Sequence, residues 1–171
     1  VQAVAALMVV IQTLQIHQFA PRSASLTEAL GVCYLTLTVV VVVSLIGLPV
    51  SILLTNIGPL AVFLGAVMSV TYITTSFLTF LGDFTTLSLH AMARSSSIVA
   101  FQLLFAIIPS ERALVFSAIA GEFIALVGLL MRKRRVLVRE VPKVRELVHY
   151  FRLTKNYSVY GTPQELVATI V

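Results

Sequence analysis

The stretch Arg132-Lys133-Arg134-Arg135 decides how the rest of the chain is interpreted, because it directly follows an apolar run that ends at Met131. Nine of the twelve Lys and Arg residues lie between Arg132 and Lys155. A basic cluster directly behind an apolar run is typical of a cytoplasmic anchor under the positive-inside rule. The cluster therefore predicts a segment that faces the cytoplasm, and its position next to a membrane span argues against a nucleic-acid partner.

The composition is that of an integral membrane protein. The mean hydropathy is +1.01 and only 11% of the residues are charged, whereas about 25% are charged in soluble domains. The net charge of +5 is concentrated in the basic cluster. We therefore expect the lipid bilayer to be the partner, with anionic headgroups contributing about 1 kcal/mol per basic side chain near the surface.

The apolar runs predict an all-α, polytopic transmembrane helix bundle, because a span needs about 20 mostly apolar residues. We expect about four complete spans and two partial ones: a partial and four complete spans in 1–131, then a basic cytoplasmic loop and the partial span that starts at 158. Both ends of the chain are apolar, so we expect it to be a piece of a longer protein. The expected spans lie near 1–17, 26–54, 60–82, 95–109 and 113–131, the loop at 132–157 and the further span at 158–171.

Local signals place the ends of these spans. Ser25-Leu26-Thr27-Glu28 has the capping-box pattern and predicts a helix start. Asp83 is expected to begin a loop that runs to Arg94. The first span is expected to have a polar exit at Gln12, Gln15 and His17.

Alternating spans then place 18–24, 83–94 and 132–157 on one side of the membrane. That side holds eleven Lys and Arg residues and the other side holds only Arg112. This distribution predicts a multi-pass protein of the cytoplasmic (inner) membrane.

The segment beyond Pro142 carries a separate helical pattern. Val141, Val144, Val148 and Phe151 recur at helical spacing, with charged residues between them. An amphipathic helix that lies in the membrane interface fits this pattern. An ordinary solvated linker helix is the alternative.

A polar stripe follows the third expected span at spacings of three and four residues, which places its members on one helix face. Such a face either packs closely against another helix through small residues or lines a watery cavity, and both can hold at different depths. The stripe consists of Gly65, Ser69, Tyr72, Ser76, Thr79 and Asp83.

Glu122 is the one carboxylate well inside an expected span. Ionisable groups at that depth are costly and are candidates for function. The alternative is a protonated acid that hydrogen-bonds a neighbouring helix, for instance through Gln102. Ser117, Gly121 and Ala125 form a stripe of small residues beside it that would let another helix approach closely.

Asp83 and Arg94 are expected at the cytoplasmic ends of consecutive spans, where they could pair. His17 and His90 are too few and too scattered for a metal site. The sequence has no nucleophile elbow, phosphate loop or Cys/His cluster. We therefore expect no enzymatic activity, no cofactor and no metal.

The segment Tyr157-Ser158-Val159-Tyr160-Gly161-Thr162-Pro163 resembles the start of the seventh helix in polysaccharide flippases of the Wzx type. These belong to the multidrug/oligosaccharidyl-lipid/polysaccharide (MOP) superfamily, and they often carry Phe-Pro-Leu-Tyr-Ser-Thr-Pro at this place. Tyr157 stands in the place of the Phe. The positions that match directly are Tyr160, Thr162 and Pro163.

The resemblance implies half of a two-bundle transporter, with the missing C-terminal half of the same protein as a partner. It implies that the substrate is a polyprenyl-diphosphate-linked oligosaccharide, moved outward for polysaccharide biosynthesis. The basic cavity residues of the family have no counterpart here, because no Lys or Arg lies inside a complete expected span. The alternatives are a lipid II flippase or cation-coupled exporter of the same superfamily, a membrane-embedded transferase of envelope synthesis, and a passive membrane anchor.

Overall fold

The computed structural model describes residues 2–54, 58–106, 111–137 and 142–170, which form helices and turns with no strand among them. The predicted all-α class is confirmed for this part of the chain. Three helical stretches are long and apolar enough to cross a membrane, and they identify the chain as a membrane protein by length and composition. These stretches are Leu26–Ile52, Gly58–Phe80 and Ala113–Lys133.

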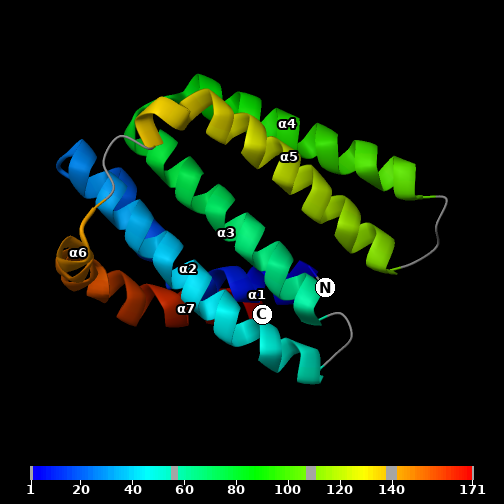
Figure 1. The fold of residues 1–171 in the computed structure, drawn as a ribbon, viewed down its shortest axis with the longest axis horizontal. Helices are drawn as coiled ribbons and strands as arrows, with labels where there is room; N and C mark the ends of the chain where they lie inside the picture. Colours follow the sequence, from blue (N-terminus) through cyan, green and yellow to red (C-terminus); the bar gives the residue numbers. More distant parts are fainter. Residues whose placement is uncertain (1, 55–57, 107–110, 138–141, 171) are drawn as a thin grey trace.

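Four long helices run up and down beside one another (Figure 1). The start of α2, the turn between α3 and α4, and the end of α5 lie at one end of this bundle, at the upper left of Figure 1. α6 lies at the same end against α2, and α7 returns beside α1. The elements are α1 (Gln2–Thr13), the 3₁₀ helix η1 (Ile16–Arg22), α2 (Leu26–Leu54), α3 (Gly58–Phe80), α4 (Phe84–Phe105), α5 (Glu111–Leu137), α6 (Val144–Asn156), the π-helical turn η2 (Tyr157–Gly161) and α7 (Thr162–Ile170).

The helix α3 ends in a glycine-dependent turn. Gly82 has a φ of +65°, a left-handed conformation that a residue without a Cβ adopts readily. The N–H of Asp83 donates to the carbonyl of Leu78 at 3.1 Å, and the N–H of Gly82 donates to that of Thr79 at 3.1 Å. This pair of bonds is the Schellman motif, which satisfies carbonyls at a helix end.

The next helix begins at once, because Asp83 is its N-cap. The carboxylate of Asp83 accepts from the backbone N–H of Thr86 at 3.0 Å and from its hydroxyl at 2.8 Å. α4 therefore starts at Phe84, and the loop predicted from Asp83 to Arg94 is wrong. The fourth expected span, 95–109, is in fact part of a helix from Phe84 to Phe105, and 107–109 lie outside the described residues.

The capping pattern before α2 is confirmed in its first half. Ser25 Oγ accepts from the backbone N–H of Glu28 at 3.2 Å. The carboxylate of Glu28 reaches one residue further back than the pattern predicts, to the backbone N–H of Ala24 at 2.8 Å. Both bonds satisfy donors that a helix start leaves free.

The first helix stops earlier than expected. α1 ends at Thr13, and Leu14 and Gln15 take left-handed conformations with φ of 45° and 55°. These angles are uncommon outside glycine, and they turn the chain into η1. The expected continuous span 1–17 is therefore divided at Leu14.

Gln12 is a buried connection between three helices rather than part of a polar exit. Its amide nitrogen donates to Ser44 of α2 at 2.9 Å and to the carbonyl of Val62 of α3 at 3.3 Å. Its amide oxygen accepts from the hydroxyl of Ser69 at 3.1 Å. Since Gln12 is fully buried, these bonds supply the partners that water cannot.

α4 and α5 pack along the predicted small residues. A Cβ added to Gly121 would lie 2.7 Å from both the Cα and the N of Ile98 in α4, so the two backbones meet there. Ser117 is fully buried and its hydroxyl lies 3.4 Å from the carbonyl of Phe101. The close approach of another helix, predicted from Ser117, Gly121 and Ala125, is confirmed.

Gly121→Ala should destabilise the protein, since the backbone of Ile98 cannot yield to a new Cβ. We expect the free energy of unfolding to fall by about 1–3 kcal/mol, as at other overpacked sites. Gly128→Ala in the same helix is the matched control, because nothing lies within 4 Å of a Cβ at that position. Its expected effect is a gain of about 0.5–1 kcal/mol from helix propensity. Unfolding in detergent measures both, and equal effects would exclude the close crossing.

Asp83 should stabilise the end of the bundle in a pH-dependent way. Its hydrogen bond with Lys133, followed by that from the backbone of Thr86, lowers the pKa of Asp83 from 3.8 to about 2. A lowered folded-state pKa gives stability that is present above pH 4 and is lost as the pH falls towards 2.

The thermal midpoint of Asp83→Asn in detergent should therefore lie below that of the wild type at pH 7, and the difference should narrow between pH 4 and pH 2. Asp83→Ala should lie lower than Asp83→Asn at every pH, because alanine also removes the N-cap. A wild-type advantage that stayed constant down to pH 2 would contradict the role of the ion pair.

Candidate functional site

An ion pair joins the middle of α4 to the middle of α5. Arg94 and Glu122 are in direct contact, with both Nε and Nη2 of the guanidinium reaching Oε1 of the carboxylate. The side chain of Glu122 is 2% exposed and that of Arg94 is 38% exposed. The carboxylate therefore lies inside the bundle, and the guanidinium covers it from the outside.

The helix crossing at Gly121 places this pair. Glu122 follows the glycine at which α5 touches the backbone of α4, so the carboxylate is held between helices. Thr71 of α3 is its neighbour from a third helix, with Oγ1 3.5 Å from Oε2. That hydroxyl donates to the carbonyl of Val67 at the shorter distance of 3.2 Å, so its contact with Glu122 is a weak one.

His90 stands one helical turn before Arg94 on the same face of α4. It is buried, at 6% exposed, and it lines cavities on both sides of α4. A buried imidazole beside an ion pair adds a third titratable group to the same region. Such a concentration of ionisable groups is common at functional sites.

A cavity of about 110 Å³ opens onto the ion pair between α3, α4 and α5. Hydroxyl groups of α3 form one wall, and the ionisable residues of α4 and α5 form the opposite wall. Polar groups therefore reach the space from both walls, although most of its exposed lining is apolar. Its lining consists of Met68, Thr71, Tyr72, Thr75, Leu87, His90, Ala91, Arg94 and Glu122.

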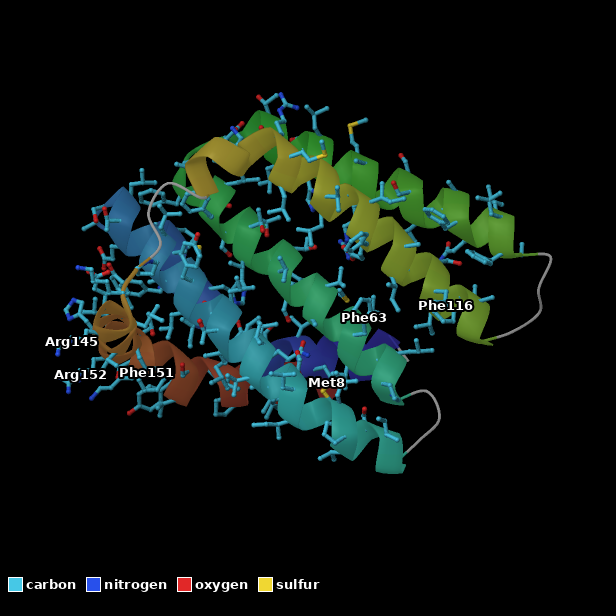
Figure 2. The ribbon with its side chains drawn as sticks, viewed as in Figure 1. Met8, Phe63, Phe116, Arg145, Phe151 and Arg152 are labelled. Atoms are coloured by element: carbon cyan, nitrogen blue, oxygen red, sulfur yellow. The ribbon has the colours of Figure 1, made fainter. Side chains whose placement is uncertain are left out.

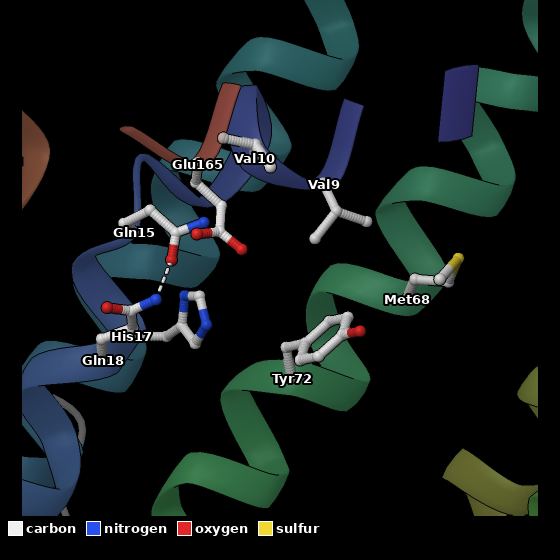
Figure 3. A pocket seen from close by; sticks show the side chains of 8 residues that line it. All are labelled: Val9, Val10, Gln15, His17, Gln18, Met68, Tyr72 and Glu165. Carbon is white, nitrogen blue, oxygen red and sulfur yellow. Dashed lines mark hydrogen bonds between the residues drawn. The ribbon is translucent and has the colours of Figure 1, made fainter. Parts of the chain in front are cut away.

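A second cavity, of about 180 Å³, lies on the other side of Tyr72 (Figure 3). Met68 and Tyr72 line both cavities, so this part of α3 is the wall between them. The imidazole of His17 faces Tyr72 with ring centroids 6.0 Å apart. Its Nδ1 is buried without a hydrogen-bond partner. The remaining lining residues are Val9, Val10, Gln15, Gln18 and Glu165.

The residues of the predicted polar stripe of α3 have different surroundings along the helix. Gly65 and Ser69 are buried, and Ser69 bonds Gln12, which is the packing alternative. Tyr72, at 44% exposed, faces the cavities instead. Ser76 is half-buried and Thr79 is exposed.

Asp83 and Arg94 do not pair with each other, which corrects that expectation. Asp83 forms its ion pair with Lys133 at the end of α5. Arg94 lies in the middle of a helix, where it meets Glu122. The expected partner of Glu122, Gln102, is replaced by this arginine.

Sequence reasoning missed Arg94 because the segment before it was assigned to a loop. The signal that identifies the helix was present: a glycine at 82 followed by Asp83, with Thr86 three residues later, is a helix end followed by an N-cap. With α4 extended back to Phe84, Arg94 falls near its centre.

The remaining predicted residues lie at the end of the bundle or beside α7. Arg132 is exposed and Lys133 bonds Asp83, while Arg134 and Arg135 continue the last turns of α5. The motif residues follow α6: Tyr160 is exposed in the π-helical turn, and Thr162 and Pro163 open α7. Pro163 has no N–H for an intrahelical bond, which fits an irregular turn at this place.

Among the described residues, no group of three or more His, Cys, Asp or Glu side chains lies close enough to hold a metal ion. The site therefore consists of an ion pair, an imidazole and hydroxyl groups around small cavities. Comparisons of the chain with protein-family models, with curated proteins and with solved structures found no match.

Proposed function

We propose that the chain is part of a flippase that moves polyprenyl-diphosphate-linked oligosaccharide across the cytoplasmic membrane for polysaccharide biosynthesis. One observation carries the proposal: the ion pair between Arg94 and Glu122 faces a cavity inside a bundle of membrane-sized helices. Ionisable groups within a membrane are expensive and usually mark a pathway for a substrate, an ion or a proton. The resemblance of the Tyr160–Pro163 segment to Wzx-type flippases selects the substrate.

The proposal places α4 in the membrane beside α5. α4 packs along α5 over the Gly121 crossing and the ion pair, and α5 contains the apolar stretch Ala113–Lys133. A helix packed antiparallel along a membrane span occupies the same depth. Thr86 and His90 of α4 are buried against protein, whereas Ser88, Ser95 and Ser96 are exposed. In this proposal the exposed hydroxyl groups face the opposed bundle or a watery pathway rather than lipid.

In this proposal, Arg94 receives the diphosphate group. A guanidinium has five N–H donors in a planar fork that suits phosphate oxygens, and Glu122 occupies only part of them. Because Arg94 is 38% exposed and Glu122 is 2% exposed, an anion in the cavity meets the guanidinium first. Glu122 holds the guanidinium in place while the site is empty.

The size of the cavities limits what these helices enclose. The volumes of about 110 and 180 Å³ are below the roughly 300–1,000 Å³ of small-molecule sites. The cavity of about 300 Å³ between α4 and α5, which His90 also lines, is at the lower limit of that range. A whole oligosaccharide does not fit, whereas a charged headgroup near Arg94 does. The sugars and the lipid chain are then held by a facing bundle and by the bilayer, as in transporters built from two opposed bundles.

The sidedness of the bundle follows from the proposal. In a Cys33→Ser background, a cysteine at position 132 should react with an impermeant maleimide only from the cytoplasm. A cysteine at position 111, at the start of α5, should react only from the opposite side. Reaction of position 111 from the inside alone would overturn the topology.

Glu122→Gln should abolish transport while the protein is still made. We expect surface polysaccharide in the native host to fall at least about tenfold, equivalent to about 1.4 kcal/mol in a rate barrier. Membrane protein level is measured alongside. The matched control is Ser117→Ala, which removes another buried polar group of α5 away from the cavity and should leave transport normal.

The charge exchange Arg94→Glu with Glu122→Arg separates transport from packing. An exchanged pair can still hold α4 to α5, so the protein level should recover relative to either single change. Transport should remain lost, because the exposed position then carries a negative group. Restored polysaccharide in the exchange variant, or normal polysaccharide in Glu122→Gln, would contradict the proposal and assign the pair to packing.

A further inference from the structure

The helix α6 presents one face to the protein and a different, apolar face to its surroundings. Tyr150 and Thr154 are buried and Leu147 is half-buried, at spacings that place them on one side of the helix. Val148 is 53% exposed and Phe151 is 46% exposed. Val148 and Phe151, two members of the apolar face predicted from the sequence, are therefore uncovered by the described part of the protein. Val141 and the side chain of Val144 lie outside the described residues.

The inner face of α6 is docked closely on α2. The ring of Tyr150 fills the space over Gly31, where an added Cβ would lie 2.1 Å from Cε2. The N-terminal turn of α6 is also fixed, because the carboxylate of Glu146 accepts from the backbone N–H of Lys143 at 2.9 Å. These contacts set the orientation of α6, so the direction of its outer face is determined.

The outer face combines apolar and basic side chains. Arg145, Arg152 and Lys155 are exposed. On a helical projection Arg152 and Arg145 follow Val148 around the helix, and Lys155 lies between Val148 and Phe151 near the end of α6. Figure 2 shows Arg145, Phe151 and Arg152 directed away from the bundle. Apolar residues bordered by basic ones are characteristic of helices that lie in a membrane interface.

The position of α6 in the fold indicates the bilayer as the occupant of this face. α6 docks near the start of α2, at the end of the bundle where Asp83 meets Lys133. From the Gly31 contact, α2 continues into exposed Val41, Leu45 and other apolar residues. The uncovered face of α6 therefore borders an apolar helix surface of membrane length.

We propose that α6 is an anionic-lipid binding helix that lies flat in the headgroup layer of the membrane. Val148 and Phe151 enter the boundary of the acyl chains, and Arg145, Arg152 and Lys155 bind the phosphate groups of anionic phospholipids. The surface holds α6, and through Tyr150 the start of α2, at a fixed depth. This role does not depend on which solute the protein moves.

A tryptophan placed in this face tests the insertion. The chain contains no Trp, so Phe151→Trp gives a single fluorescent reporter in the purified chain reconstituted in nanodiscs. Its emission should be blue-shifted, and lipids brominated near the headgroup should quench it more strongly than lipids brominated deep in the acyl chain. Leu153→Trp, on the opposite flank and 41% exposed, is the matched control and should emit as a water-exposed residue.

The lipid preference is measured by native mass spectrometry in mixed phosphatidylglycerol and phosphatidylcholine. Each of Arg145→Gln and Arg152→Gln should lower the preference for phosphatidylglycerol about fivefold, which corresponds to about 1 kcal/mol per basic side chain. Both changes leave the docked face intact. The proposal is overturned if brominated lipids do not quench the Phe151→Trp reporter. That result is expected if another protein covers the outer face of α6. An unchanged lipid preference in both arginine variants also overturns the proposal.

Discussion

The ion pair between Arg94 and Glu122 is the interaction that the arrangement of α3, α4 and α5 depends on. A carboxylate that is 2% exposed is stable in an apolar bundle only with a partner, since an uncompensated buried charge costs several kcal/mol. The partner comes from α4, so α4 must lie where its arginine reaches Glu122. Gly121 makes that position possible by allowing the backbones to meet at Ile98. The cavity beside the pair follows from the same constraint.

The same requirement for internal partners explains other parts of the fold. The buried amide of Gln12 bonds residues of α2 and α3, and the carboxylate of Asp83 joins the turn before α4 to the end of α5. Each polar group connects helices that hydrophobic packing alone would leave free to slide. Such bonds fix the register of helices whose remaining contacts are between similar aliphatic side chains.

The sequence was sufficient for the features that depend on local pattern. Hydropathy identified the segments of α2, α3 and α5, and the Ser25 to Glu28 spacing identified a helix start. The polar residues after Asp83 were misread as a loop, because the low hydropathy of the segment was given more weight than the helix-end and N-cap signals at Gly82 and Asp83. The partners of Gln12 were not predictable for a similar reason: they are 32, 50 and 57 residues away along the chain.

For α6, periodicity found the helix but not the face that docks, which depends on the space over Gly31. The candidate site was predictable in its carboxylate, since Glu122 is unusual within its own segment, and in Tyr72 of the polar stripe, which lines the cavities. Its cation, Arg94, can be assigned to the site only when α4, the helix that contains it, is given its correct start at Phe84. A local sequence pattern therefore identifies a buried charged group more readily than the distant residue that stabilises it.

The three-residue connection formed by Leu81, Gly82 and Asp83 has a mechanical consequence. The connection is too short for α3 and α4 to separate at this end. The ion pair between Asp83 and Lys133 holds the end of α5 at the same point. α4 and α5 are joined further along by their ion pair. We therefore expect them to tilt together as one rigid unit about the turn at Gly82 and Asp83. A helix of 22 residues is about 33 Å long, and a tilt of about 10° would displace its far end by about 6 Å. A small rotation at the basic end of the bundle would therefore give a larger displacement at the opposite end.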